Sequence, residues 1–131
     1  MTKHIELPPG QPATRVLAMP TDTNPAGDIF GGWLMAQVDI AGGLIAGQRA
    51  AGRVVTVAVN AFEFHEPVYV GDLVSCYGEV IHSGRTSIKI KVEAYAQRHS
   101  PYSRIVKATE AEMTFVAVDD RGAPRLLPAA E

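Results

Sequence analysis

The segment from Ile29 to Gln48 is almost free of charge, and Asp39 is its only charged residue. Its large apolar side chains cover nearly every direction around a helical wheel: Trp33, Leu34, Met35, Val38, Ile40, Leu44 and Ile45. A helix that is apolar on all sides is a buried helix. Because Gly42, Gly43 and Gly47 each cost a helix ~1 kcal/mol relative to alanine, we expect another backbone to approach closely there.

The remainder of the chain has the patterns of β-strands. We expect a short strand before the helix and four after it: Thr14–Met19, Arg53–Phe64, Leu73–Ile81, Ser87–Ala96 and Arg104–Val118. The continuous apolar run Arg53–Phe64 is typical of a strand covered on both faces. Alternation of apolar and polar residues in Ser87–Ala96 predicts one face on the core and the other in water. His82–Arg85 is expected to be a hairpin connection.

One helix on an antiparallel sheet of about five strands is an α+β arrangement. A chain of 131 residues is the usual size of one domain. We assign this domain to residues 14–128 and expect residues 1–13, which contain three prolines, to be a flexible N-terminal segment. Since one sheet covers only one side of the helix, a second copy of the chain is expected to cover the rest.

The composition excludes several classes of partner and compartment. A net charge of -2 provides no general attraction to nucleic acid or to anionic lipid. The chain has neither an apolar leader nor an uncharged run of the ~18 residues needed to span a bilayer. A lone cysteine, Cys76, excludes an intramolecular disulfide and fits a reducing compartment, so we expect a cytoplasmic protein.

No familiar cofactor or metal motif occurs. The chain lacks the glycine-rich loops that cradle nucleotide phosphates. Its histidines, His4, His65, His82 and His99, do not have the spacing of metal ligands. Cys76 lies in the middle of a strand pattern, which favours a small buried apolar residue over a nucleophile. We therefore predict no cofactor and no metal.

Asp39 is the candidate for the chemistry. A carboxylate inside an apolar helix loses solvation, which raises its pKa and makes it a plausible base. The alternative is a structural Asp paired with a buried donor. The residues alone do not decide between the two.

The junction between the loop and the helix is the second candidate. Gly31 and Gly32 stand where the helix begins, so their N–H groups are free of shielding side chains. Such groups form a site for a negatively charged oxygen. A glycine-rich entry required only for tight packing is the alternative.

A basic stretch is the third candidate. Between residues 85 and 107, six basic residues and one acidic residue give a local charge of +5 in a chain of net charge -2. These residues are Arg85, Lys89, Lys91, Arg98, Arg104 and Lys107, with Glu93 as the acid. The stretch is either a solvated strand face that discourages edge pairing or a surface for a small molecule that carries several phosphates.

Five short motifs follow one another along the chain. They are N-x-x-G-D-I-F-G-G-W (Asn24–Trp33), M-A-Q-V-D-I-A-G-G (Met35–Gly43), G-R-V-V-T-V-A-V (Gly52–Val59), F-x-x-P-V-x-x-G-D (Phe64–Asp72) and K-A-T-E-A (Lys107–Ala111). In this order they resemble the hotdog-fold acyl-CoA thioesterases of the YciA type. The resemblance implies one long helix wrapped by a curved antiparallel sheet, pairing of two chains through that sheet, and a trimer of such dimers.

The resemblance also implies hydrolysis of acyl-coenzyme A to coenzyme A and a fatty acid. Asp39 matches the family's catalytic acid and Asn24 its loop asparagine. Thr56 matches a strand hydroxyl that helps to hold water, and Gly32 would provide an N–H to the thioester oxygen. For coenzyme A itself, the expected contacts are Arg85, Thr86, Ser87 and Lys107.

Helix geometry adds a constraint of its own. Gly32 and Asp39 are seven residues apart, which is about 10 Å at ~1.5 Å per residue. A thioester carbonyl must lie within ~3 Å of both its oxyanion donors and the attacking group. We therefore predict a composite site, with Asn24 and the glycine N–H groups from one chain and Asp39 from another.

Two other functions stay open. A hydratase or dehydratase acting on acyl thioesters would use a histidine with an acid, and His65–Glu66 is the candidate pair. A non-catalytic acyl-CoA binding module would use the apolar helix and the basic stretch equally well.

Overall fold

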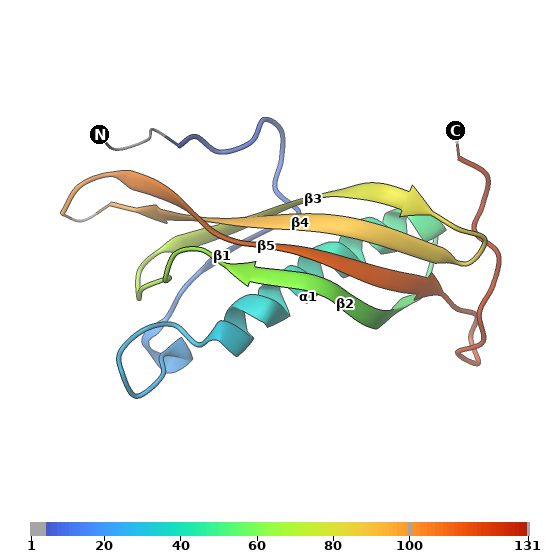
Figure 1. The fold of residues 1–131 in the computed structure, drawn as a ribbon, viewed down its shortest axis with the longest axis horizontal. Coiled ribbons are helices and arrows are strands. Elements are labelled where there is room, and N and C mark those ends of the chain that lie inside the picture. The colour runs from blue at the N-terminus through green and yellow to red at the C-terminus, as the bar shows by residue number, and fades with distance from the viewer. Residues whose placement is uncertain (1–4, 100, 131) are drawn as a thin grey trace.

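The computed structural model describes residues 5–99 and 101–130. Its elements are, in chain order, β1 (Thr14–Leu17), a 3-10 helix η1 (Pro20–Asp22), α1 (Gly31–Ala50), β2 (Val54–Phe64), β3 (Leu73–Ser83), β4 (Ser87–Arg98) and β5 (Arg104–Ala117). The strands form one sheet in the order β1-β3-β4-β5-β2. All neighbouring strands are antiparallel, and α1 lies along one face of the sheet (Figure 1). The expected α+β architecture is confirmed.

Only one side of α1 is buried within the chain. The buried positions recur at helical spacing on the side that faces the sheet: Leu34, Val38, Ala41, Gly42, Ala46 and Ala50. On the other side, Ile40 and Leu44 are 52% and 51% exposed. Burial on all sides is therefore wrong for a single chain, because the one sheet has no second layer to cover the far side. The expected need for a second copy rests on this exposed apolar surface.

Gly42 is a close contact, but its neighbour is a side chain. A Cβ built on Gly42 would lie 3.0 Å from the ring of Phe115, which leaves no room for it without a shift of the ring. At Gly47 the nearest atom to such a Cβ would be the backbone oxygen of Gly52, at 3.5 Å. The backbone near Gly47 belongs to the turn that ends the same helix, at an ordinary contact distance, and at Gly42 the close neighbour is an aromatic ring. The predicted close approach of another element's backbone is therefore not seen at these two glycines within one chain.

The burial predicted from sequence is confirmed for β4 but not for β2. In β4 the alternation is confirmed, since Ile88, Ile90 and Val92 are fully buried and the residues between them are not. β2 was expected to be covered on both faces, and this is wrong for the isolated chain. It is an edge strand that pairs only with β5, and Val57 and Val59 are 54% and 47% exposed. The apolar side chains of β2 therefore form part of an exposed surface that no other described segment of the same chain covers.

The segments before β1 and after β5 are hydrogen-bonded to the rest of the domain. At the start, the N–H of Ala13 donates to the carbonyl of Cys76 in β3 at 2.8 Å. At the other end, the Arg125 guanidinium donates to the carbonyl of Ala50, the last residue of α1, at 2.9 Å. The N–H of Leu127 donates to the carbonyl of Arg85 at 2.9 Å. The C-terminal segment thereby links the end of α1 to the β3–β4 turn (Figure 1).

Within residues 5–99 and 101–130, no helix combines the length and the apolar character needed to cross a membrane.

Candidate active site

Asp39 and Thr56 form the centre of the site. Asp39 lies in the middle of α1, and Thr56 faces it from β2. The Thr56 hydroxyl donates a hydrogen bond of 2.7 Å to Asp39 Oδ1. Both residues are exposed, so the predicted loss of solvation at Asp39 is not produced by this chain alone. The carboxylate instead lies on the side of α1 that the sheet leaves uncovered.

A pocket of about 360 Å³ opens beside this pair. Its walls are mostly apolar and come from α1, β2 and β5: Gly32, Met35, Ala36, Asp39, Thr56, Val59, Phe62 and Met113. A pocket with apolar walls and few polar groups is the usual form of a small-molecule site. Asp39, Thr56 and Gly32 of one chain therefore line the same pocket.

The two glycines at the start of α1 have different environments. A Cβ on Gly31 would lie 3.4 Å from the ring of Phe64, whereas one on Gly32 would meet nothing within 4 Å. Tight packing within the chain thus accounts for Gly31 but not for Gly32. Within the described part of the chain, neither glycine N–H has a hydrogen-bond acceptor. Gly32, which lines the pocket, therefore has a free N–H donor in the first turn of α1.

Asn24 lies in the loop before α1 and does not line this pocket. Its Oδ1 accepts hydrogen bonds from the N–H groups of Ala26 at 2.9 Å and Asp28 at 3.2 Å. The side-chain oxygen therefore shapes the loop. The Asn24 amide nitrogen has no acceptor among the described residues, so it remains able to donate to a bound molecule.

The residues expected to bind coenzyme A fall into two places. Arg85 and Thr86 form the β3–β4 turn, and Ser87 begins β4, close to the C-terminal end of α1. Lys107 is paired in register with Tyr95. Since Tyr95 is eight steps along β4 from Ser87, Lys107 lies ~26 Å from the turn at ~3.3 Å per residue. One phosphate group cannot contact both places, so within one chain the structure does not bring Lys107 to the other three residues.

Lys107 is also already paired. Its Nζ lies 2.6 Å from carboxylate oxygens of both Glu93 and Glu110. Burial lowers the pKa of Lys107, but the hydrogen bonds to the two carboxylates outweigh this effect and raise the pKa above its ordinary value. Arg98 is likewise bound, to Asp72 at 3.0 Å. The positive charges of Lys107 and Arg98 are therefore neutralised by acidic side chains of the same chain, which favours the interpretation of this part of the basic stretch as an ordinary strand surface.

The histidine pair expected of a hydratase does not meet Asp39. His65 and Glu66 line a different pocket, of about 300 Å³, beside Gly31 and Phe64. The imidazole of His65 faces Glu63 and Glu110. The geometry therefore gives no support to a hydratase that combines His65 with Asp39.

Sequence reasoning missed the pocket walls contributed by Phe62 and Met113. It also missed the grouping of His65 with Glu63 and Glu110, because only the register of the strands brings these residues together. Cys76 is buried, and burial raises the pKa of its thiol, as expected of a structural cysteine.

Comparison with known proteins agrees with this geometry. A family model of the thioesterase superfamily matches residues 26–101. The acyl-CoA thioester hydrolase YciA of Escherichia coli K12 is 49% identical over 130 residues, and the match covers 98% of each chain.

Two solved structures are similar throughout. The hexameric thioesterase from Yersinia pestis has a TM-score of 0.88 and 52% identity, with 95% of this chain and 100% of that chain covered. A hexameric hotdog-fold thioesterase from Campylobacter jejuni has a TM-score of 0.88 and 41% identity, with 91% of each chain covered. The chain therefore belongs to the thioesterase superfamily and is a hotdog-fold thioesterase of the YciA type.

Proposed function

We propose that this protein hydrolyses acyl-coenzyme A to coenzyme A and a free carboxylic acid. The observation that carries the proposal is the Asp39 carboxylate, held by Thr56 at 2.7 Å on the wall of an apolar pocket. The identity to an acyl-CoA thioester hydrolase over nearly the whole chain supports the same substrate. A fatty acyl chain suits the pocket walls formed by Met35, Phe62 and Met113.

Each group has a role in the hydrolysis. The Gly32 N–H donates to the thioester oxygen and stabilises the negative charge that develops on it. Asp39 takes a proton from a water molecule, whose oxygen then forms a bond to the carbonyl carbon. The C–S bond breaks, and the coenzyme A thiolate leaves with the proton that Asp39 returns, so that Asp39 is again a carboxylate. In the variant of this mechanism in which Asp39 is the nucleophile, its oxygen forms the first bond and water completes the hydrolysis.

The proposed site is shared between two chains. Gly32 and Asp39 of one helix lie about 10 Å apart, so they cannot both contact one carbonyl group. The exposed apolar side chains of Ile40 and Leu44, and those of the edge strand β2, provide the surface for a partner. We propose that Asn24 and Gly32 of one chain complete the site around Asp39 of the other. A hexamer built as a trimer of dimers agrees with the hexameric relatives.

We further propose that the β3–β4 turn binds the phosphates of coenzyme A. The turn offers the exposed Arg85 guanidinium and the hydroxyls of Thr86 and Ser87. An arginine with neighbouring hydroxyls is a suitable donor set for a phosphate group. We place the reaction in the cytoplasm, since the single cysteine suits a reducing compartment.

A non-catalytic acyl-CoA binding module is the second candidate, because pocket and basic turn would serve binding alone. A thiol reagent that reports free coenzyme A separates the two functions. An enzyme releases many equivalents of thiol per chain from an acyl-CoA substrate. A binding module releases none above the uncatalysed rate, and that result would reject the proposed activity.

A further inference from the structure

Three glutamates stand side by side on the face of the sheet that points away from α1. In the register of the sheet, Glu110 of β5 lies directly opposite Glu63 of β2 and directly opposite Glu93 of β4. Like charges in directly opposed positions destabilise a sheet. A cation in either of the two gaps of this row would therefore be stabilising.

The gap between Glu110 and Glu93 contains such a cation. Lys107 Nζ bridges the two carboxylates at 2.6 Å from each. The hydrogen bond from Lys107 lowers the pKa of Glu110, with the result that this carboxylate keeps its charge in mildly acidic solution. One gap in the row is thus compensated by a side chain that is always charged near neutral pH.

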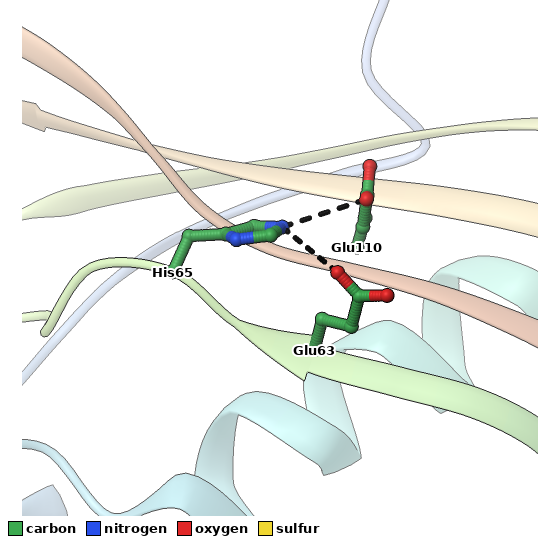
Figure 2. A group of neighbouring side chains, drawn as sticks. All are labelled: Glu63, His65 and Glu110. Carbon is green, nitrogen blue, oxygen red and sulfur yellow. Dashed lines mark ion pairs between the residues drawn. The ribbon is translucent and has the colours of Figure 1, made fainter.

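The gap between Glu63 and Glu110 contains a histidine instead. His65 Nε2 lies 3.5 Å from Glu110 Oε1 and 3.7 Å from Glu63 Oε2, and the imidazole points between the two carboxylates (Figure 2). These separations are too long for hydrogen bonds. The gap between Glu63 and Glu110 therefore lacks a hydrogen-bonded bridge like the one that Lys107 forms on the other side.

The three atoms have the spacing of ligands around a metal ion. One ligand atom from each residue can be chosen so that all three lie within 4.8 Å of one another. In a tetrahedral zinc site with bonds of ~2.0–2.2 Å, two ligand atoms are about 3.3–3.6 Å apart. The two distances from His65 Nε2 are close to this range before any adjustment of the side chains.

Glu63 and Glu110 lie on strands β2 and β5, and His65, which directly follows β2, is tied to β5 by a backbone hydrogen bond. The N–H of His65 donates to the carbonyl of Ala108 in β5 at 2.8 Å. The carbonyl of Glu63 accepts from the Thr109 hydroxyl at 3.0 Å. Since both anchors are in β5, the end of β2 is fixed against the strand that carries Glu110. Ligands on strands keep their mutual geometry better than ligands on loops.

The surroundings favour a divalent cation. A shallow pocket of about 130 Å³ beside the cluster is lined by Glu63 and Glu110 together with Lys91 and Glu112. With the neighbouring Glu93 and Lys107, four glutamates and two lysines leave this surface with a formal charge of -2. A divalent ion neutralises that charge, and one imidazole with two carboxylates is a donor set that suits zinc.

We propose that Glu63, His65 and Glu110 bind a divalent transition-metal ion of the zinc class on the outer face of the sheet, with water as the fourth ligand. The ion joins β2 to β5 at the end of β2. This site does not depend on the proposed thioesterase activity, because none of its three residues lines the pocket that contains Asp39.

Isothermal titration calorimetry with zinc chloride tests the proposal, using the tag-free full-length protein after treatment with a chelator. We expect one zinc ion per chain. Glu63→Gln and His65→Gln should each weaken binding at least ~10-fold, since even residues outside the ligand shell change metal affinity by that factor. Circular dichroism checks that the variants fold, which is expected because neither side chain is buried: that of His65 is 37% exposed and that of Glu63 62%.

Matched controls separate this site from general attraction to acids. Glu112→Gln removes a glutamate from the same pocket, and His82→Gln removes an exposed histidine elsewhere. Both should retain the affinity for zinc. Cobalt(II) should give the visible absorption of a tetrahedral complex, and millimolar Mg²⁺ should not compete, because Mg²⁺ requires octahedral oxygen ligands.

The proposal is overturned if zinc does not bind below about 1 mM, if the two ligand variants bind like the unaltered protein, or if Mg²⁺ competes as well as zinc. A thermal stability that follows the protonation of His65 and ignores zinc would also overturn it. In that case a proton, not a metal, compensates the two carboxylates.

Discussion

The hydroxyl of Thr56 and the carboxylate of Asp39 are joined by a hydrogen bond of 2.7 Å between β2 and α1. Because a hydroxyl has one proton to donate, this bond fixes one carboxylate oxygen, Oδ1. The other oxygen, Oδ2, has no hydrogen-bond donor among the described residues and remains available to a water molecule or to a thioester. Thr56 therefore positions Asp39 for its proposed reaction.

Replacing Thr56 by valine should impair turnover while leaving the fold intact. Valine preserves the shape of the side chain but removes the donor to a charged oxygen, a bond worth ~1.5–3 kcal/mol. We expect kcat to fall about 10- to 100-fold, with a smaller change in KM. Steady-state release of coenzyme A, followed with a thiol reagent, measures the effect.

Two further variants control for structural damage. Thr56→Ser retains the hydroxyl and should keep most of the activity. Thr114→Val removes an equivalent hydrogen bond, from Thr114 to Asn60 at 2.7 Å, without touching the pocket, and should have little effect. Equal losses in Thr56→Val and Thr56→Ser would show that the hydroxyl has no positioning role.

Mixed assemblies test the composite site. Asn24→Asp keeps the side-chain oxygen that accepts from Ala26 and Asp28 but removes the amide donor. Chains with Asn24→Asp and chains with Asp39→Asn should each be inactive. In a mixed dimer, one of the two sites would contain both intact residues, so random pairing should restore about a quarter of the full activity.

The assay is the thiol release of co-refolded mixtures compared with each variant alone. Native mass spectrometry confirms that mixed assemblies form. If they form and remain inactive, Asn24 and Asp39 act from the same chain, and the composite site is wrong.

Arg85 and Lys107 should respond differently to substitution, although both belong to the basic stretch. Arg85→Ala should raise KM for acyl-CoA several-fold with little change in kcat, because a phosphate contact acts equally on substrate and transition state. Lys107→Ala should leave KM unchanged and instead reduce stability by ~1 kcal/mol, since it leaves three carboxylates in a row.

A truncated acyl thioester without the nucleotide is the control substrate. Arg85→Ala should not change its KM, and salt should weaken only the full substrate. A similar rise in KM for both substrates would contradict a role of Arg85 in binding phosphate.

The periodicity of the chain was sufficient to predict the elements and their order. α1 was expected at 29–48 and occupies Gly31–Ala50, and the alternation in β4 located the core face correctly. The prediction failed where an apolar run faces a surface that the chain does not cover itself. Val57 and Val59 in β2 and Ile40 in α1 are exposed for this reason, and so is Asp39. An apolar sequence indicates eventual burial but does not say which chain provides it.

The site was predicted in part. Asp39, Thr56 and Gly32 of one chain line one pocket, whereas the predicted pairing of Gly32 with Asp39 of a second chain stays a prediction. Arg85 and Lys107 belong to the same basic stretch but lie apart within one chain, because about 26 Å of extended strand separates Ser87 from Tyr95, the partner of Lys107. The expectation that both contact coenzyme A stays a prediction. The approach of His65 to Glu63 and Glu110 depends on the register of β2 against β5, which includes two irregularities that no local pattern predicts.

The most direct test of the central claim is the rate of thiol release by the Asp39→Asn protein. An amide oxygen at this position can still accept the hydrogen bond from Thr56, so the pocket keeps its shape while the base is lost. We predict that kcat falls at least ~100-fold relative to the unaltered protein, with unchanged circular dichroism and assembly. The exposed Asp120→Asn serves as the control and should retain full activity. Turnover near that of the unaltered protein in a well-folded Asp39→Asn variant would contradict the account.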